Sequence, residues 1–207
     1  TVQAIKDKIS LNPVLNSFQH TFHNYDIEWH LVDSFLKSME MDLLQSKYNS
    51  IEYDNYIYGS AEVVGLMCLR VFTNGDHNLY EKLIPYAKKL GSAFQKINFL
   101  RDLQDDYEKL GRTYFPNIDL KNISSKDKRL IESEIELEFD EALSGIKLLP
   151  DNSKKGVYLA YVYYKQLFVK IKNLEPKHVL NSRIRIHNYK KMQLMFQSLI
   201  RVKLNLL

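Results

Sequence analysis

The residues with the clearest chemical potential lie in one short segment, between Gln95 and Asp106. Asn98, Asp102 and Asp106 follow one another at intervals of four residues. On an α-helix this spacing places three side-chain oxygens on successive turns of one face, where they can converge on a hard cation. Mg²⁺ prefers oxygen ligands and is commonly shared with substrate phosphates. The spacing therefore indicates a candidate magnesium site, although acidic residues four apart also occur on solvated helix faces.

The helix face that carries these oxygens begins as a small and apolar surface. Ala87, Gly91 and Phe94 precede Gln95 and Asn98 on the same stripe. Buried carboxylates need a metal or a cationic partner, so a face that turns from apolar to acidic is not a simple packing face. We expect it to form one wall of a binding cavity.

A longer pattern surrounds the segment, made of Gln95, Asn98, Arg101, Asp102 and Asp106, then Arg112, Tyr114 and Pro116. It closely resembles the second aspartate-rich motif of the squalene and phytoene synthase family, in which N-x-x-R-D-x-x-x-D leads into R-x-Y-x-P. The resemblance implies that Asn98, Asp102 and Asp106 bind Mg²⁺, or Mn²⁺ in its place. It also implies a catalytic part for Arg101 and substrate contacts for Gln95, Arg112 and Tyr114. The motif is one residue longer than usual before the arginine, which leaves Asp105 and Asp106 as alternatives for the second aspartate ligand.

A second similar segment lies upstream, at residues 56–65, and matches the family's Y-x-Y-G-x-A-G-x-V-G helix. The resemblance implies a catalytic part for Tyr56. It also implies that Ala61, Val64 and Gly65 let a prenyl chain pass close to the backbone. Tight helix packing is the alternative explanation of the small residues. Glu62 stands where the family often has glycine.

The carboxyl-terminal part carries looser matches and an uneven charge. Tyr163, Arg183 and Arg185 are similar to the tyrosine and arginine that the family uses to bind diphosphate, although each also suits an ordinary amphipathic helix. Residues 176–207 contain no Asp or Glu. We expect this basic segment to lie along the mouth of the cavity and to favour an anionic membrane surface. No recognisable module indicates nucleic-acid binding, and the net charge is only +4.

Helices must position these residues. Seven Gly and five Pro over 207 residues are too few for the many turns of an all-β protein. The spacing of apolar residues and the breaks between them predict helices at 13–24, 27–46, 52–73, 78–108, 125–148, 153–173 and 183–204. The chain has no linker-like stretch, so we expect one helical domain over residues 1–207. Cys68 lies in an apolar run and is expected to be buried.

The resemblance extends over residues 50–200. It implies an all-α isoprenoid (terpenoid) synthase fold, a helical bundle around a central cavity. It also implies a transferase of carotenoid biosynthesis, most like the bacterial phytoene synthases. Such an enzyme joins two geranylgeranyl diphosphates head to head through a cyclopropyl intermediate. A squalene or dehydrosqualene synthase that uses farnesyl diphosphate is the alternative within the family.

The family's first aspartate-rich motif, D-x-x-x-D, has no counterpart in residues 1–50, where Asp26 and Asp33 are seven residues apart. Together with the absence of an initiator methionine, this favours a chain that begins after the motif. A degenerate motif in a non-catalytic relative, which binds lipid or a partner protein, is the alternative. No apolar stretch approaches the about 18 residues of a membrane span. We therefore expect a cytoplasmic protein, with peripheral contact to the inner membrane face as a further expectation.

Overall fold

The computed structural model describes residues 1–44, 47–111, 113–116, 118, 123–175, 184–204 and 206–207, and only the backbone of residues 107–110. The elements are α1 (Val2–Asp7), α2 (Pro13–Asn24), α3 (Trp29–Leu44), α4 (Ser50–Ile57), the π-helical turn η1 (Tyr58–Glu62), α5 (Val63–Thr73), α6 (His77–Leu110), α7 (Ser125–Leu148), α8 (Asp151–Lys172) and α10 (Asn188–Lys203). The only extended pairing in these ranges is an isolated bridge between Lys47 and Thr113. The predicted all-α fold is confirmed.

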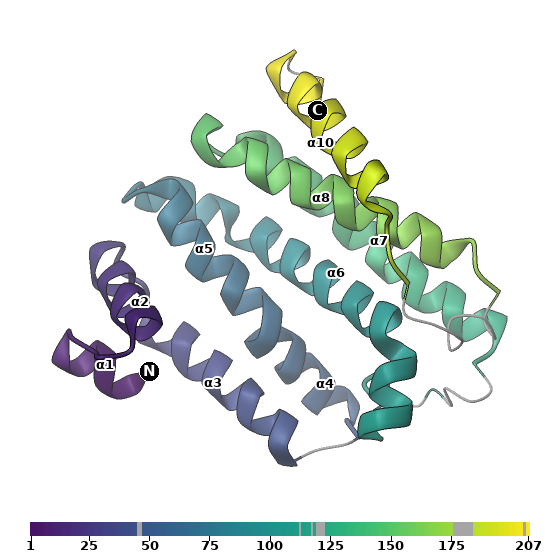
Figure 1. The fold of residues 1–207 in the computed structure, drawn as a ribbon, viewed down its shortest axis with the longest axis horizontal. Coiled ribbons are helices and arrows are strands. Elements are labelled where there is room, and N and C mark those ends of the chain that lie inside the picture. The colour runs from purple at the N-terminus through teal and green to yellow at the C-terminus, as the bar shows by residue number, and fades with distance from the viewer. Residues whose placement is uncertain (45–46, 112, 117, 119–122, 176–183, 205) are drawn as a thin grey trace.

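The long helix α6 is the central element of the bundle (Figure 1). It packs against α5 and η1 on one side and against α7 and α8 on the other. Helix α10 lies on the outside of α8, and the short helices α1 and α2 contact each other at the amino-terminal end of the bundle (Figure 1). Helix α6 lies between α5 and η1 on one side and α7 and α8 on the other. The faces of α6 that these elements leave uncovered can therefore line a site between the helices.

Polar caps fix where three of the helices begin. The Asn12 side chain accepts hydrogen bonds from the first turn of α2. Asn49 and Glu52 exchange hydrogen bonds of 2.9 and 2.8 Å at the start of α4. Ser124 and Asp127 form the same reciprocal cap on α7. Each such cap stabilises a helix by about 1 kcal/mol and satisfies backbone donors that the helix cannot pair internally.

The helix predicted over residues 52–73 is continuous but irregular. It consists of α4, one π-helical turn and α5. Gly59 lies in the π-helical turn, and a Cβ at this position would lie 2.5 Å from the carbonyl oxygen of Ser34 in α3. The wider turn thus occurs where α3 and the backbone of residue 59 are in direct contact. Such a turn depends on tertiary packing, which the spacing of apolar residues does not reveal.

The prediction of one helix over residues 183–204 is wrong at its start. Ile184 and Ile186 are buried whereas Arg185 and His187 are exposed, an alternation with a period of two that belongs to extended backbone. The backbone N–H of Ile184 donates to the carbonyl oxygen of Arg101 at 3.4 Å. The segment therefore lies against α6, and α10 begins only at residue 188. Helix α1 was not predicted.

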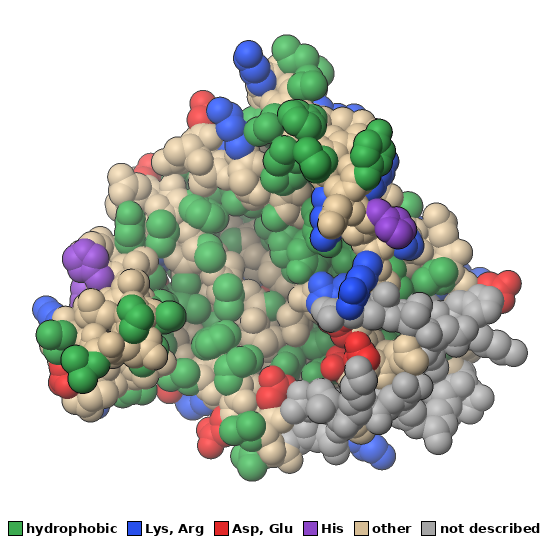
Figure 2. Space-filling model, in the orientation of Figure 1, with side chains coloured by type: hydrophobic (Ala, Val, Ile, Leu, Met, Phe, Trp, Pro, Cys, Tyr) green, Lys and Arg blue, Asp and Glu red, His purple; other side chains and the backbone are tan. Residues whose placement is uncertain are grey.

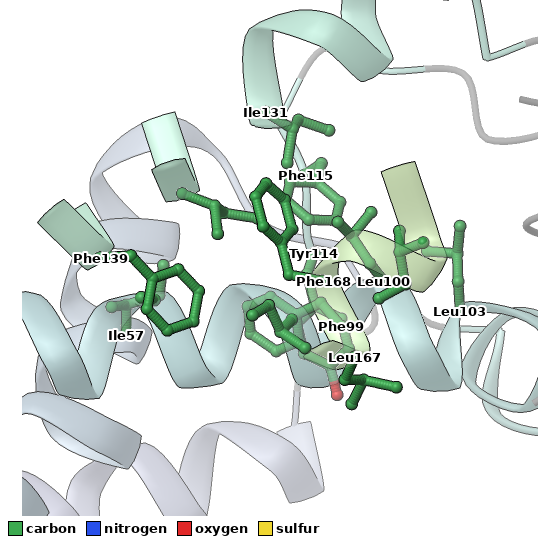
Figure 3. Close-up of a cluster of buried hydrophobic side chains, with 14 of the residues drawn as sticks. Ile57, Phe99, Leu100, Leu103, Tyr114, Phe115, Ile131, Phe139, Leu167 and Phe168 are labelled. Carbon is green, nitrogen blue, oxygen red and sulfur yellow. The ribbon is translucent and has the colours of Figure 1, made fainter. Parts of the chain in front are cut away.

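A cluster of buried hydrophobic side chains packs on one side of α6 and is rich in aromatic rings (Figure 3), and two smaller clusters lie elsewhere among the described helices. Phe99 of α6 stacks on Tyr114 with ring centroids 4.0 Å apart. Leu100 and Leu103 continue this buried face toward the end of α6. Phe139 from α7 and residues 167 and 168 from α8 complete the cluster. The core thereby fixes the rotation of α6 and leaves the stripe with Gln95 and Asn98 on a different face.

A buried ionic cluster joins α6 to α7. The Lys96 ammonium donates to a carboxylate oxygen of Glu134 at 2.5 Å and of Glu138 at 2.7 Å. The Ser92 hydroxyl donates to the same oxygen of Glu138 at 2.8 Å. Lys96 is 3% exposed and Glu138 is 6% exposed. Burial raises the pKa of Glu138, and Lys96 and Ser92 oppose that shift.

Candidate active site

An apolar cavity of about 580 Å³ opens between α5, α6, α7 and α8. Figure 2 shows the hollow on one face of the molecule, with hydrophobic side chains gathered around it. Its wall includes small residues from η1, α5, α6 and α7, such as Ala61, Gly65, Gly91 and Gly145. Small side chains leave the space that larger ones would fill. The cavity is therefore suited to a long apolar ligand.

The small residues of α5 and α6 serve helix packing as well as the cavity. A Cβ on Gly65 would lie 3.0 Å from the carbonyl oxygen of Ala87. A Cβ on Gly91 would lie 2.7 Å from the carbonyl oxygen of Ala61. Ala61, Val64 and Gly65 all line the cavity. The two explanations of this segment, close packing and a cavity wall, are thus compatible at the same residues.

The cavity becomes polar at the end marked by Gln95 and Asn98 of α6. The Tyr164 hydroxyl of α8 donates to the side-chain oxygen of Asn98 at 3.2 Å. The ring of Phe94 stacks on Tyr164, with ring centroids 3.9 Å apart. The cavity, which is largely apolar although its wall also includes Ser60, Asn152 and Ser153, therefore has two amides and one hydroxyl at this end, which can bind a polar head group.

Asp102 and Arg101 follow one turn beyond this polar end and pair with each other. The Arg101 Nε–H lies 3.1 Å from both carboxylate oxygens of Asp102, and a second guanidinium nitrogen lies 2.5 Å from Oδ2. The hydrogen bond to Asp102 raises the pKa of Arg101. The two side chains are 22% and 21% exposed, so the pair remains accessible from solvent. It supplies a cation and an anion side by side, one turn of α6 beyond the polar end of the cavity.

The predicted metal ligands share a chemistry that suits Mg²⁺. Asn98, Asp102 and Asp106 offer only oxygen donors, at intervals of four residues along α6. Asp105 and Asp106 are both half-buried, so burial does not distinguish between them as ligand. Across the ranges that the structure describes, no three acidic, histidine or cysteine side chains converge on one point. The donor set fits the ion, and magnesium binding stays a prediction.

Two predicted site residues lie in the hydrophobic core instead of the cavity wall. Tyr56 is 4% exposed and donates its hydroxyl to Asp42 at 3.1 Å. Burial raises the pKa of Tyr56. Tyr114 is 5% exposed, and its ring packs on Tyr56 and Phe99. Both rings pack against the buried face of α6. We therefore expect them to support the helix that carries the polar end of the cavity.

Of the four remaining predicted site residues, the structure describes two, Tyr163 and Arg185. Arg112 and Arg183 lie outside the described residues. Tyr163 is next to the cavity residue Tyr164, but its ring packs near the Lys191 ammonium, at 5.6 Å. Arg185 is exposed and belongs to a separate hollow between α8 and the start of α10. Neither Tyr163 nor Arg185 contributes to the wall of the large cavity.

Among the residues of the cavity wall that the sequence did not reveal are Tyr164 and Cys68. Tyr164 bonds to Asn98, whereas the family pattern pointed to its neighbour Tyr163. The apolar stripe that includes Val157 and Tyr164 was the available signal, because both residues line the cavity. Cys68 was expected to be buried but is exposed on the cavity wall. Its apolar surroundings still raise the pKa of the thiol through desolvation.

The fold is that of the isoprenoid synthases of the squalene synthase type. A solved dehydrosqualene synthase in complex with ligand superposes with a TM-score of 0.76 and 23% identity, over 98% of this chain and 75% of that chain. Residues 1–190 match the family model described as squalene/phytoene synthase. The chain therefore belongs to the squalene/phytoene synthase family.

Curated relatives of two kinds resemble the chain. The chloroplastic phytoene synthase of Daucus carota is 28% identical over 165 residues, which cover 71% of this chain and 41% of the carrot protein. The 4,4'-diapophytoene synthase of Staphylococcus haemolyticus is 24% identical over 189 residues, which cover 83% of this chain and 63% of the relative. The chain thus spans less than two thirds of the length of either protein.

Proposed function

We propose that the protein is a prenyltransferase that condenses two isoprenoid diphosphates head to head. The observation that carries the proposal is the cavity, whose apolar walls end at Gln95, Asn98 and Tyr164 beside the Arg101–Asp102 pair. An apolar channel with a polar end matches a prenyl chain with a diphosphate head. Membership of the squalene/phytoene synthase family supports the same reaction class.

The polar residues at this end of the cavity would have different roles in binding the diphosphate. The Gln95 and Asn98 amides would bind and orient it, and Arg101 would contact phosphate oxygens in the bidentate manner of guanidinium groups. Two unit charges about 4 Å apart interact by about 4 kcal/mol near a protein surface, so bare carboxylates would repel the diphosphate. Asn98, Asp102 and Asp106 would therefore hold Mg²⁺, or Mn²⁺, which when bound neutralises the charge of the leaving diphosphate.

The apolar walls would protect the reacting carbons. Phe94 and Tyr164 present stacked aromatic faces at the polar end of the cavity, where an allylic cation would form. Aromatic faces attract cations, and closely packed side chains exclude the water that would otherwise capture them. The substrate would be geranylgeranyl diphosphate, which gives phytoene through a cyclopropyl diphosphate. Farnesyl diphosphate and a dehydrosqualene-type product are the alternative.

Binding of a substrate analogue tests the proposal without requiring turnover. The thio analogue of geranylgeranyl diphosphate, with sulfur in place of the bridging oxygen, is titrated into the full-length protein by calorimetry in the presence of Mg²⁺. Gln95→Leu is expected to weaken binding about tenfold, because it removes an amide at the polar end. Gln197→Leu, at an exposed position of α10, is the matched control and leaves affinity unchanged. Absence of binding to the unmodified protein would contradict the proposal.

We also propose that α10 contacts an anionic membrane surface. Exposed apolar side chains lie three or four residues apart at Tyr189, Met192, Phe196 and Leu199, next to Ile200, and the exposed Leu204 follows the end of the helix. The same helix contains Lys190, Lys191, Arg201 and Lys203 and no acidic residue. An apolar stripe flanked by cations suits the interface of an anionic bilayer, from which a prenyl substrate would arrive. No helix in the described ranges is long and apolar enough to cross a membrane.

Flotation with liposomes tests this contact. The protein is expected to float with vesicles that contain anionic lipid, less so at high salt, and not with neutral vesicles. Met192→Glu combined with Phe196→Glu should abolish flotation, since both residues are 56% exposed and the change does not disturb the core. Ile51→Glu places the same change at an exposed site on α4 and should have no effect. Flotation that is indifferent to anionic lipid, salt and the α10 variant would refute the membrane contact.

A further inference from the structure

A second, smaller hollow of about 230 Å³ lies between α8 and the segment that leads into α10. Helix α10 lies along the outside of α8 (Figure 1). The wall of this small hollow includes Val169, Lys170, Arg185, Ile186, His187 and Lys190, and no Asp or Glu is among its described residues. None of its residues lines the large cavity. The small hollow is therefore a separate, positively charged site, which the proposed reaction does not use.

The three cations of the small hollow are not neutralised by carboxylates. Two other lysines of α8 pair with carboxylates of α7, at 3.4 and 2.9 Å. Lys170 donates instead to the backbone carbonyl of Arg185 at 2.7 Å, and Lys190 donates to the amide oxygen of Gln193 at 3.1 Å. Each ammonium keeps further N–H donors. Glu175, the acidic residue nearest in sequence, is not part of the wall. The small hollow thus offers uncompensated positive charge and hydrogen-bond donors to an anion.

A phosphate group fits this set of donors. A guanidinium such as that of Arg185 can bind two phosphate oxygens side by side, and the ammonium groups of Lys170 and Lys190 bind as point charges. The ring of His187 can donate one further hydrogen bond. A phosphomonoester carries about 1.5 to 2 negative charges at neutral pH and three terminal oxygens, and a phosphodiester has fewer of both. Three cations on one wall therefore favour a phosphomonoester.

The size of the small hollow favours a lipid head group over a soluble ligand. Pockets that enclose a small molecule usually measure about 300–1,000 Å³, so a hollow of 230 Å³ encloses little more than a head group. Its wall also has an apolar part, formed by Ile186 and the exposed Val169. Tyr189, next to Lys190, is 84% exposed and begins the apolar stripe of α10. Acyl chains attached to a head group in the small hollow would therefore continue over apolar surface.

Lys190 lies at the border between the small hollow and the apolar stripe. Lys190 and Leu194 are four residues apart, so they share a face of α10, and Leu194 is buried. Tyr189 points about 100° away from Lys190 around the helix. An amphipathic helix lies in the plane of the membrane interface with its apolar face below the head groups. The flank of α10 that carries Lys190 would then lie at the level of the head groups.

We infer that the small hollow binds the phosphomonoester head group of an anionic membrane lipid through Lys170, Arg185 and Lys190. The inference rests on the membrane contact proposed for α10, and it adds a defined site to a general attraction between charges. General attraction depends on the charge density of the membrane, whereas a site distinguishes between head groups at equal charge density. The two are therefore separable by experiment.

Vesicles matched in surface charge test the inference. One set contains phosphatidic acid in phosphatidylcholine and the other phosphatidylglycerol, in proportions adjusted until the zeta potentials agree. The protein is expected to bind the phosphatidic acid vesicles about tenfold more tightly. Arg185→Gln combined with Lys190→Gln should abolish this preference, because two of the three cations are lost. Lys147→Gln combined with Lys155→Gln is the matched control, since it removes the same charge from exposed positions of α7 and α8 outside the small hollow, and it should keep the preference.

Two results with vesicles would overturn the inference. One is equal binding to both sets by the unmodified protein, which would leave the membrane contact of α10 intact. The other is loss of the preference in the control variant. Glycerol 3-phosphate has the same head group without acyl chains, and it is expected to displace the protein from the phosphatidic acid vesicles only at millimolar concentrations. Displacement at micromolar concentrations would make the occupant a soluble phosphate ester and would overturn the assignment to a lipid.

Calorimetry separates the small hollow from the substrate site. The Arg185→Gln and Lys190→Gln variant should bind the thio analogue of geranylgeranyl diphosphate as tightly as the unmodified protein, because neither residue lines the large cavity. Weakened binding of the analogue in this variant would assign the small hollow to the substrate and overturn the inference. A protein that prefers phosphatidic acid vesicles but does not bind the analogue would support the inference and contradict the proposed reaction alone.

Discussion

Replacing Lys96 with methionine is expected to lower the free energy of unfolding by about 3–5 kcal/mol. Lys96 is buried between α6 and α7 and donates to both Glu134 and Glu138. Methionine keeps most of the volume of lysine but removes the charge that compensates the buried Glu138 carboxylate. Ser92 would remain as a hydrogen-bond donor, which cannot offset a full charge. Chemical denaturation of variant and wild type at neutral pH measures the difference.

The pH dependence of this difference has a definite sign. Burial already raises the pKa of Glu138 above its usual value of 4.5, and removal of Lys96 should raise it further. A carboxyl whose pKa is raised by folding contributes stability below its unfolded pKa and loses that contribution as the pH rises through its folded pKa. The deficit of Lys96→Met relative to wild type should therefore be largest near pH 7 and shrink toward about pH 5.

Two control variants separate the buried charge from other effects. Lys96→Met combined with Glu138→Leu should recover most of the lost stability, because no uncompensated charge remains. Lys172→Met removes an ion pair with Glu136 that is largely exposed, and it should cost less than about 1 kcal/mol. A Lys96→Met protein within about 1 kcal/mol of wild type would show that the cluster does not join α6 to α7 in the way described.

Asp102→Asn should reduce the rate of condensation about a thousandfold, which corresponds to about 4 kcal/mol of transition-state stabilisation. The change keeps the shape of the side chain but removes the charge that would hold Mg²⁺ beside the diphosphate. Asp102 also loses its ion pair with Arg101, which is partly exposed and should contribute less than about 1 kcal/mol to stability. The variant is therefore expected to fold and to bind the diphosphate weakly.

A paired titration with Mg²⁺ measures both properties. The melting temperature of the wild type, with the thio analogue present, should rise as Mg²⁺ is added, whereas that of Asp102→Asn should rise much less. Asp140→Asn is the matched control, because its carboxylate is largely exposed and pairs only with Lys165 at 3.4 Å in the described contacts. If Asp102→Asn turns over at the wild-type rate with the same Mg²⁺ dependence, Asp102 is not a metal ligand.

Helix positions were predictable where local signals set them. The predicted ranges 13–24 and 125–148 coincide with α2 and α7, both of which begin at side-chain caps. The predicted range 78–108 lies within α6, although Pro85 interrupts the sequence there. These boundaries depend on residues within a few positions of the helix end, so the sequence alone contains the necessary information.

Features that depend on distant parts of the chain were not predictable. The extended segment at residues 184–187 follows from the burial of Ile184 and Ile186 against the core and from a backbone hydrogen bond to α6. The π-helical turn coincides with the close approach of Gly59 to Ser34. Neither partner is near in sequence, and the apolar spacing of both segments also suits an ordinary helix.

The candidate site shows the same division. Periodicity along α6 placed Gln95 and Asn98 at the cavity, because rotation about a helix follows from residue spacing alone. The tyrosines were less predictable, since Tyr56 and Tyr114 pack in the core while Tyr164 faces the cavity. An aromatic residue suits both environments, so its location depends on which helices meet.

The central claim is that this family member condenses two prenyl diphosphates in its cavity, and product analysis tests it most directly. Full-length protein is incubated with Mg²⁺ and either farnesyl or geranylgeranyl diphosphate, and the extracted lipids are identified by chromatography and mass spectrometry. We expect a C40 head-to-head hydrocarbon from the C20 substrate, with two diphosphates released per product, none without Mg²⁺, and formation about a thousandfold slower with Asp102→Asn. Recovery of the bound prenyl diphosphate unchanged, or its conversion only to the prenyl alcohol, would contradict the claim. The protein would then be a lipid-binding relative of these enzymes.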